Sequence, residues 1–146
     1  MKHNSVNYSI LDIFFSVVAN RFQRDFQMEG GPSNCKALDC GAGIGRITKH
    51  LLAKHFSSVD LVEQNKIFLE KAKENLKSCA HKIDKLFCCG LQNFLPENSY
   101  YDVIWCQWVL GHLTDAHLVQ FFERCLYVFF HLRALKNFIF NRNLYI

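Results

Sequence analysis

Gly41, Gly43 and Gly45 form a G-x-G-x-G pattern directly after a short apolar run, residues 36–40. A turn this tight needs backbone angles that glycine reaches freely, and small residues let backbone N–H groups approach a ligand at a helix N-terminus. A dinucleotide fingerprint would carry its third glycine where Arg46 stands. The spacing therefore favours a nucleoside cofactor other than a nicotinamide dinucleotide. The alternative is a plain strand-to-helix turn.

Polar groups also follow the later apolar runs. Glu63 ends the second run, about twenty residues past the glycines, where an acidic side chain accepts hydrogen bonds from ribose hydroxyls. Arg46 can pair with a ligand carboxylate. Leu91 and Gln92 follow the third run and can place backbone and amide groups on an adenine. The plain alternatives are a solvated carboxylate, an exposed helix arginine and an ordinary turn.

A second distinctive stretch, residues 105–112, holds Gln107, Trp108 and His112. It follows the fourth apolar run, so these side chains are expected in the same cleft as the cofactor. A tryptophan offers an apolar wall to a small substrate group, and a histidine accepts a proton near neutral pH. A lone histidine is more often structural, so His112 is a catalytic candidate only in this context.

Alternating patterns predict the elements that position these residues. Strands with helices between them indicate an α/β fold with a doubly wound, mainly parallel sheet. Five or more strands are usual in such a sheet, and only four are recognisable before residue 127, so the sheet is expected to be incomplete at its C-terminal strands. The strands are expected at 36–40, 58–63, 86–89 and 101–106, and the helices at 9–22, 47–55, 65–76 and 115–126.

The last twenty residues do not follow this alternation. Residues 128–130 and 138–140 could be strands, and 132–137 fits a helix equally well. We therefore expect one domain over residues 1–126 and an atypical Phe-rich tail over 127–146. An open sheet edge or exposed phenylalanines there would favour self-association or another partner chain.

Composition limits the class of protein. With 146 residues, half of them hydrophobic, the chain has room for one packed domain. The net charge of +4 is spread out, which argues against direct nucleic-acid binding. The seven cysteines contain no zinc-like C-x-x-C pair and indicate reduced thiols in the cytosol or nucleus. A secretory signal is not expected, because the amino end lacks an apolar stretch and a small-residue cleavage site. A membrane span is not expected either, because the apolar run 126–132 is too short.

Four stretches together resemble the protein N-terminal methyltransferases, which methylate the α-amino group of proteins beginning Xaa-Pro-Lys. The resemblance covers roughly residues 9–125 and rests on 38–49, 87–92, 101–108 and 111–115. It implies a Rossmann-like class I methyltransferase fold and S-adenosylmethionine as the cofactor, with no metal. It also implies protein substrates and a nuclear and cytoplasmic location.

The resemblance also implies roles for single residues. Trp108 and His112 would face the substrate amino terminus. Gly41, Gly43, Arg46, Glu63, Leu91, Gln92 and Gln107 would bind the cofactor. The family usually has Asp at the position of Glu63, and either carboxylate can reach two hydroxyls.

The chain departs from the family pattern at both ends. The family's Asn and Asp that hold the substrate amine lie beyond the start of the tail, and nothing in 127–146 matches them. The family's amino-terminal segment that helps to cover the cofactor has no counterpart. The expectation is a shortened form of such an enzyme, and the alternative is a catalytically impaired protein that still binds cofactor or a partner.

Overall fold

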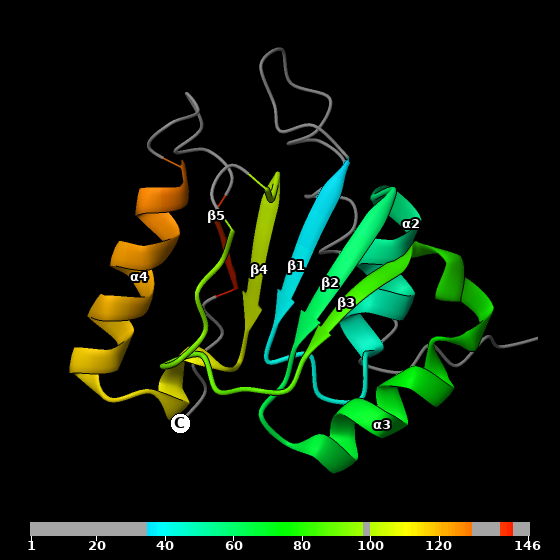
Figure 1. The fold of residues 1–146 in the computed structure, drawn as a ribbon, viewed down its shortest axis with the longest axis horizontal. Helices are drawn as coiled ribbons and strands as arrows, with labels where there is room; N and C mark the ends of the chain where they lie inside the picture. The colour runs from blue at the N-terminus through cyan, green and yellow to red at the C-terminus, as the bar shows by residue number, and fades with distance from the viewer. Residues whose placement is uncertain (1–34, 98–99, 130–137, 142–146) are drawn as a thin grey trace, which may run out of the picture. The chain divides into compact units, whose positions relative to one another are not determined.

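The fold is a five-stranded parallel sheet, seen in a computed structural model that describes residues 35–97, 100–129 and 138–141 (Figure 1). The strands lie in the order β3-β2-β1-β4-β5. They are β1 (Lys36–Cys40), β2 (Ser58–Val62), β3 (Ile83–Phe87), β4 (Val103–Gln107) and β5 (Phe138–Asn141). The chain winds outward from β1 in both directions, so β1 and β4 flank the switch point at which open α/β sheets bind ligands.

Helices cover both faces of this sheet (Figure 1). They are the π-helical turn η1 (Thr48–Leu52), α2 (Ala53–His55), α3 (Lys66–Asn75), the 3₁₀ turns η2 (Lys77–Lys82) and η3 (Leu110–His112), and α4 (Asp115–Phe129). Successive side chains of β1 point to opposite faces. Leu38 and Cys40 pack in one cluster with Phe121 of α4, whereas Asp39 accepts a hydrogen bond from Thr48 of η1. The sheet is therefore doubly wound, as expected.

A buried ion pair lies at the end of the sheet away from the glycines. Lys36 Nζ lies 2.7 Å from Asp60 Oδ1 and also contacts Asp84 and Ser58. Tyr101 donates its hydroxyl proton to Asp60 Oδ2 at 2.9 Å. Burial lowers the pKa of Lys36, but the hydrogen bonds to Asp60 and Asp84 outweigh burial and raise that pKa overall. Lys36 is therefore charged inside the fold.

Most predicted elements are confirmed with small shifts at their ends. The strand at 36–40 is found as predicted, and the strands at 58–63 and 101–106 are found at 58–62 and 103–107. The helix at 47–55 is confirmed as η1 and α2, 65–76 as α3 and 115–126 as α4. These segments carried the clearest apolar periodicity, because each buries one helical face or a whole strand.

The third strand was placed too late in the sequence. It was expected at 86–89 but runs from Ile83 to Phe87, paired with β2 through Val59, Leu61 and Val62. Asp84 and Lys85 interrupt its apolar pattern because the strand is at the edge of the described sheet and these side chains form ion pairs. The apolar run 86–89 instead extends past the strand towards the glycine at 90.

The tail contains both a confirmed and a wrong prediction. The strand at 138–140 is confirmed as β5, which pairs in parallel with β4. The strand at 128–130 is wrong for its first two residues, because α4 continues through Phe129. α4 crosses residue 126, and the division into a domain and a tail there stays a prediction. The expected helix at 9–22 and residues 132–137 lie outside the described residues.

One expectation concerned membranes. Within the part of the chain that the structure describes, no helix has both the length and the apolar character needed to cross a bilayer.

Candidate functional site

The glycine loop, residues 41–45, turns at the carboxyl end of β1. Its glycines all have positive φ: 70° at Gly41, 56° at Gly43 and 78° at Gly45. Residues with a side chain rarely adopt such angles. At Gly41 an added Cβ would also lie 2.4 Å from Cγ2 of Val109. The pattern is therefore required by backbone shape, and at Gly41 by packing as well.

Glu63 lies beside this loop, directly after β2. Its Oε2 accepts a hydrogen bond from the Gly43 N–H at 2.8 Å, and its Oε1 accepts one from the Asn65 N–H at 2.8 Å. Only 8% of the residue is exposed. The carboxylate is thus fixed in one position, where it can accept further hydrogen bonds from a ligand.

Helix α3 connects the segment after Glu63 to the glycine loop. Its N-cap is Asn65, whose Oδ1 accepts hydrogen bonds from the Ile67 and Phe68 N–H groups, and its last residue is Asn75. Asn75 Nδ2 donates to the Ile44 carbonyl of the glycine loop at 3.0 Å. The bonds of Glu63 to Gly43 and Asn65 close a ring, which we call the loop frame: Gly43, Ile44, Glu63, Asn65 and Asn75. The frame holds the glycine loop and the carboxylate at a set separation.

Asp39 lies at the base of the loop, 2% exposed. Its Oδ2 accepts a hydrogen bond from the Thr48 hydroxyl at 2.6 Å. Burial raises the pKa of Asp39 to about 6, and the nearby charge of Glu63 contributes to the increase. Through its hydrogen bond with Thr48, Asp39 connects β1 to η1 beneath the loop.

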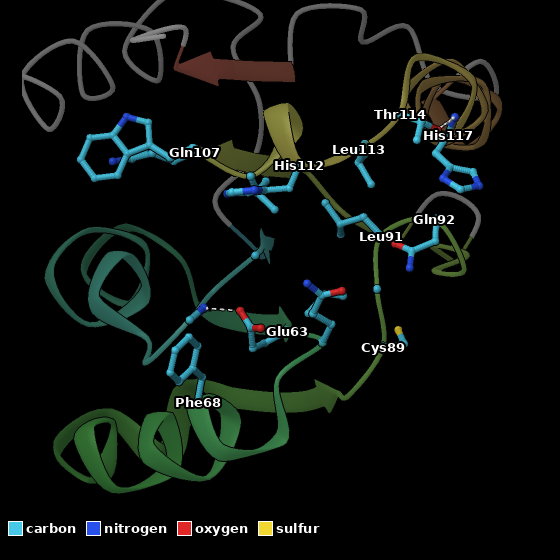
Figure 2. Close-up of a pocket in the computed structure, with 17 residues that line it drawn as sticks. Glu63, Phe68, Cys89, Leu91, Gln92, Gln107, His112, Leu113, Thr114 and His117 are labelled. Atoms are coloured by element: carbon cyan, nitrogen blue, oxygen red, sulfur yellow. Dashed lines mark hydrogen bonds between the residues drawn. The ribbon is translucent and has the colours of Figure 1, made fainter. Parts of the chain in front are cut away.

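Gly41, Gly43 and Glu63 border a pocket of about 490 Å³ (Figure 2). This volume is within the ~300–1,000 Å³ typical of small-ligand sites. The pocket lies at the carboxyl ends of the strands. It is lined by Gly41, Gly43, Val62, Glu63, Gln64, Phe68, Cys89, Gly90, Leu91, Gln92, Gln107, Trp108, Val109, His112, Leu113, Thr114 and His117.

The turn that follows β3 forms one wall of the pocket. Leu91 is 5% exposed, and the Gln92 side chain folds over Gly90, where an added Cβ would lie 2.4 Å from the Gln92 amide group. Arg124 of α4 donates hydrogen bonds to three carbonyls of this turn: Leu91 at 2.9 Å, Gln92 at 3.1 Å and Phe94 at 3.0 Å. Hydrogen bonds from α4 therefore hold this turn in place.

The segment after β4 forms the opposite wall. The Trp105 indole N–H donates to Gln107 Oε1 at 3.3 Å, which orients the Gln107 amide. Trp108 has a φ of 56° and is 57% exposed. A bulky residue with such a φ is strained, and strain of this kind clusters at functional sites. Figure 2 places His112 on this wall, across the pocket from Glu63.

Comparison with known proteins identifies the family. The model of the AdoMet-dependent proline di-methyltransferases matches residues 9–134 of the chain. The chain belongs to this family. N-terminal Xaa-Pro-Lys N-methyltransferase 1-B of Xenopus laevis is 55% identical over 73% of this chain and 49% of its own length. The corresponding bovine methyltransferase 1 is 55% identical over 72% of this chain and 46% of its length.

Solved structures agree with the fold. A SAM-dependent methyltransferase from Leishmania major has a TM-score of 0.71 and 36% identity, covering 81% of this chain and 47% of that one. A phosphoethanolamine N-methyltransferase from Haemonchus contortus, at 23% identity and a TM-score of 0.60 over 66% of this chain and 20% of that one, shows the same fold. The fold is the Rossmann-like methyltransferase fold. The chain spans about half the length of the curated relatives it matches.

The residues present fit the family cofactor, AdoMet (S-adenosylmethionine). The glycines leave the loop backbone open to a ligand: an added Cβ at Gly43 would meet nothing within 4 Å. Glu63 provides a fixed, acceptor-only carboxylate, which suits the two hydroxyl donors of a ribose. The apolar side of Leu91 and the amide of Gln92 suit a flat base with polar edges.

The structure brings together eight of the nine predicted site residues. Gly41, Gly43, Glu63, Leu91, Gln92, Gln107, Trp108 and His112 all line the pocket. Arg46 does not belong to the described lining residues and is exposed after the loop. The roles assigned to all nine stay predictions.

Other lining residues were not predicted for the site. Phe68 lies in the expected helix 65–76 and was given no role in the site, but it is 47% exposed and lines the pocket. The signal for several of the others was their position immediately after a strand or a predicted site residue. Gly90 also lines the pocket, in the same turn as the predicted Leu91 and Gln92. The missed residues are Val62, Gln64, Phe68, Cys89, Val109, Leu113, Thr114 and His117.

Proposed function

We propose that this chain binds S-adenosylmethionine in the pocket and methylates the α-amino group of proteins that begin Xaa-Pro-Lys. The observation that carries the proposal is the bond between the Gly43 N–H and Glu63 Oε2, which holds the carboxylate proposed to bind the ribose in the pocket that Trp108 and His112 also line. The relatives named N-terminal Xaa-Pro-Lys N-methyltransferases support the choice of substrate.

Each wall has its own task in this proposal. Glu63 accepts hydrogen bonds from the ribose hydroxyls, and Leu91 and Gln92 contact the base. Gln107 contacts the cofactor from the end of β4. Trp108 and His112 receive the substrate amino terminus at the outer end of the pocket.

The chemistry requires few groups from the protein. S-adenosylmethionine supplies an activated methyl group from its sulfonium. The acceptor amine must present a lone pair, so it must lose its proton first. An α-amino group has a pKa near 7.7 to 8.0, and a substantial fraction is already neutral near pH 7. His112 takes the remaining proton as a general base, and the pocket contributes mainly by aligning the amine.

The test has two parts. Calorimetric titration of the folded chain with S-adenosylhomocysteine measures cofactor binding. Mass spectrometry then measures methyl transfer to a peptide beginning Ser-Pro-Lys, with the N-acetylated peptide as control. Transfer to the free peptide alone supports the proposal, and binding without transfer refutes its catalytic half. A folded chain that does not bind refutes the cofactor assignment.

Binding without transfer is the second candidate function. The cofactor-side residues all lie in the described part of the chain, whereas the match covers about half of each relative's length. In this second function the chain is catalytically impaired but still binds S-adenosylmethionine or a partner protein. A nicotinamide cofactor is disfavoured by Arg46 at the third-glycine position.

The setting of the protein is also a proposal. All seven cysteines are free thiols, which supports a reducing compartment, the cytosol or nucleus. Partner proteins are expected to be substrates rather than nucleic acids or membranes. Self-association through the tail or a sheet edge would appear in the mass measured by light scattering.

A further inference from the structure

Arg124 lies in α4 and is not itself one of the predicted site residues. Its neighbours on the helix, Phe121 and Cys125, are completely buried, so the backbone at Arg124 is fixed. The Arg124 Nη2 donates to the Leu91 and Gln92 carbonyls at 2.9 and 3.1 Å, and Nε donates to the Phe94 carbonyl at 3.0 Å. One cation therefore holds three main-chain carbonyls of the turn after β3.

These three bonds determine which polar groups the turn presents. A peptide unit is planar and trans, so its N–H points opposite to its carbonyl. Fixing the Leu91 carbonyl on Arg124 therefore also fixes the Gln92 N–H, which points away from the guanidinium. A second restraint is the Asn93 N–H, which donates to the Gly90 carbonyl at 3.0 Å. Together they hold the wall that Leu91 and Gln92 form in the pocket.

We infer that Arg124 is a positioning residue for recognition of the cofactor base. It is not among the described lining residues and acts through the carbonyls of Leu91 and Gln92. A planar guanidinium spans several acceptors at fixed angles, whereas the ammonium of lysine is a single point charge. The inference rests on the proposed binding of S-adenosylmethionine and adds the residue that sets base specificity.

The test compares two ligands that differ only at the base. S-adenosylhomocysteine carries adenine, and S-inosylhomocysteine carries hypoxanthine, in which a carbonyl replaces the amino group and N1 becomes a donor. A fixed turn should bind the adenine form more tightly. Arg124→Met should weaken S-adenosylhomocysteine binding by about tenfold or more, because hydrogen bonds to charged groups contribute strongly. It should also bring the two dissociation constants closer together, and Arg124→Lys should fall between Met and the parent.

Lys82→Met is the matched control. Lys82 Nζ also binds main-chain carbonyls, those of Ala53 at 2.7 Å and Phe56 at 3.1 Å, but neither residue lines the pocket. This control should lower the melting temperature as an Arg124 variant does, and it should leave the ratio of the two dissociation constants unchanged. If Arg124 only stabilised the fold, Arg124→Met would likewise lower the melting temperature and leave the ratio of the two dissociation constants unchanged.

Several outcomes would overturn the inference. It fails if Arg124→Met keeps the parent affinity, or if both ligands weaken by the same factor. A folded parent that binds neither ligand refutes the proposed function instead. In that case, and also if Arg124→Met does not fold, the deciding measurement is hydrogen exchange of the amides of residues 91–94 in the milder Arg124→Lys variant. Faster exchange than in the parent supports the positioning role, and equal exchange overturns it.

Discussion

Replacing Gly41 with alanine should destabilise the protein more than the same replacement at Gly43. Both positions have positive φ, 70° and 56°, so each alanine costs about 1–2 kcal/mol of conformational strain. At Gly43 an added Cβ meets nothing within 4 Å. At Gly41 the three nearest atoms all belong to Val109, with Cγ2 at 2.4 Å and Cβ at 2.6 Å. Overpacking of this kind adds about 1–3 kcal/mol.

The assay is urea unfolding of four proteins: the parent, Gly41→Ala, Val109→Gly and the double variant. Glycine at 109 removes both clashing atoms, whereas alanine would leave Cβ in place. The cost of Gly41→Ala should therefore fall to the strain alone in the Val109→Gly background. The coupling between the two sites should be about 1–3 kcal/mol.

Two results would refute this reasoning. One is equal loss of unfolding free energy in Gly41→Ala and Gly43→Ala. The other is an unchanged cost of Gly41→Ala when residue 109 is glycine. Either would mean that the contact with Val109 does not explain why a glycine is needed at 41.

The remaining predictions concern a base, a buried acid and a buried cation. His112→Ala should preserve the affinity for S-adenosylhomocysteine and lower any methyl transfer; equal transfer rates would return His112 to a structural role. Because burial raises the pKa of Asp39 from its ordinary value of 3.8 to about 6 in the folded protein, its contribution to stability falls as pH rises from about 4 to 6. The unfolding free energy of Asp39→Asn minus that of the parent should then increase over this range by about 3 kcal/mol, and a pH-independent difference would contradict it. Lys36→Met leaves Asp60 buried without its cation and should cost about 3–5 kcal/mol in urea unfolding. A loss below 1 kcal/mol would show that the remaining donors, the Tyr101 hydroxyl and the Lys85 N–H, suffice.

The part of the site that lies at the ends of strands could be predicted from the sequence. Glu63 and Gln107 stand at the carboxyl ends of β2 and β4, the two parallel strands on either side of β1, so the sheet itself brings them to one edge. Phe68 was missed because helical periodicity marks apolar positions without saying whether they face a core or a pocket. The start of β3 was missed because Asp84 and Lys85 are charged at an edge strand.

Arg124 carried no signal in the sequence. It binds main-chain carbonyls, and every residue type offers those, so nothing in residues 91–94 indicates a partner. The π-helical form of η1 was equally hidden, since apolar spacing over eight residues does not distinguish it from an α-helix. Both depend on tertiary contacts that a local pattern does not contain.

In the proposed function, where Glu63 binds the ribose, the loop frame also limits which nucleosides the pocket admits. A carboxylate has about four lone-pair sites, and the frame uses two of those on Glu63 for the Gly43 and Asn65 N–H groups. Two sites remain, which matches the two hydroxyl donors of an unmodified ribose without any rearrangement. A ribose phosphorylated at its 2′ position would replace a donor with an anionic acceptor at this carboxylate. The frame therefore discriminates by charge at the sugar, independently of how the far wall recognises the base.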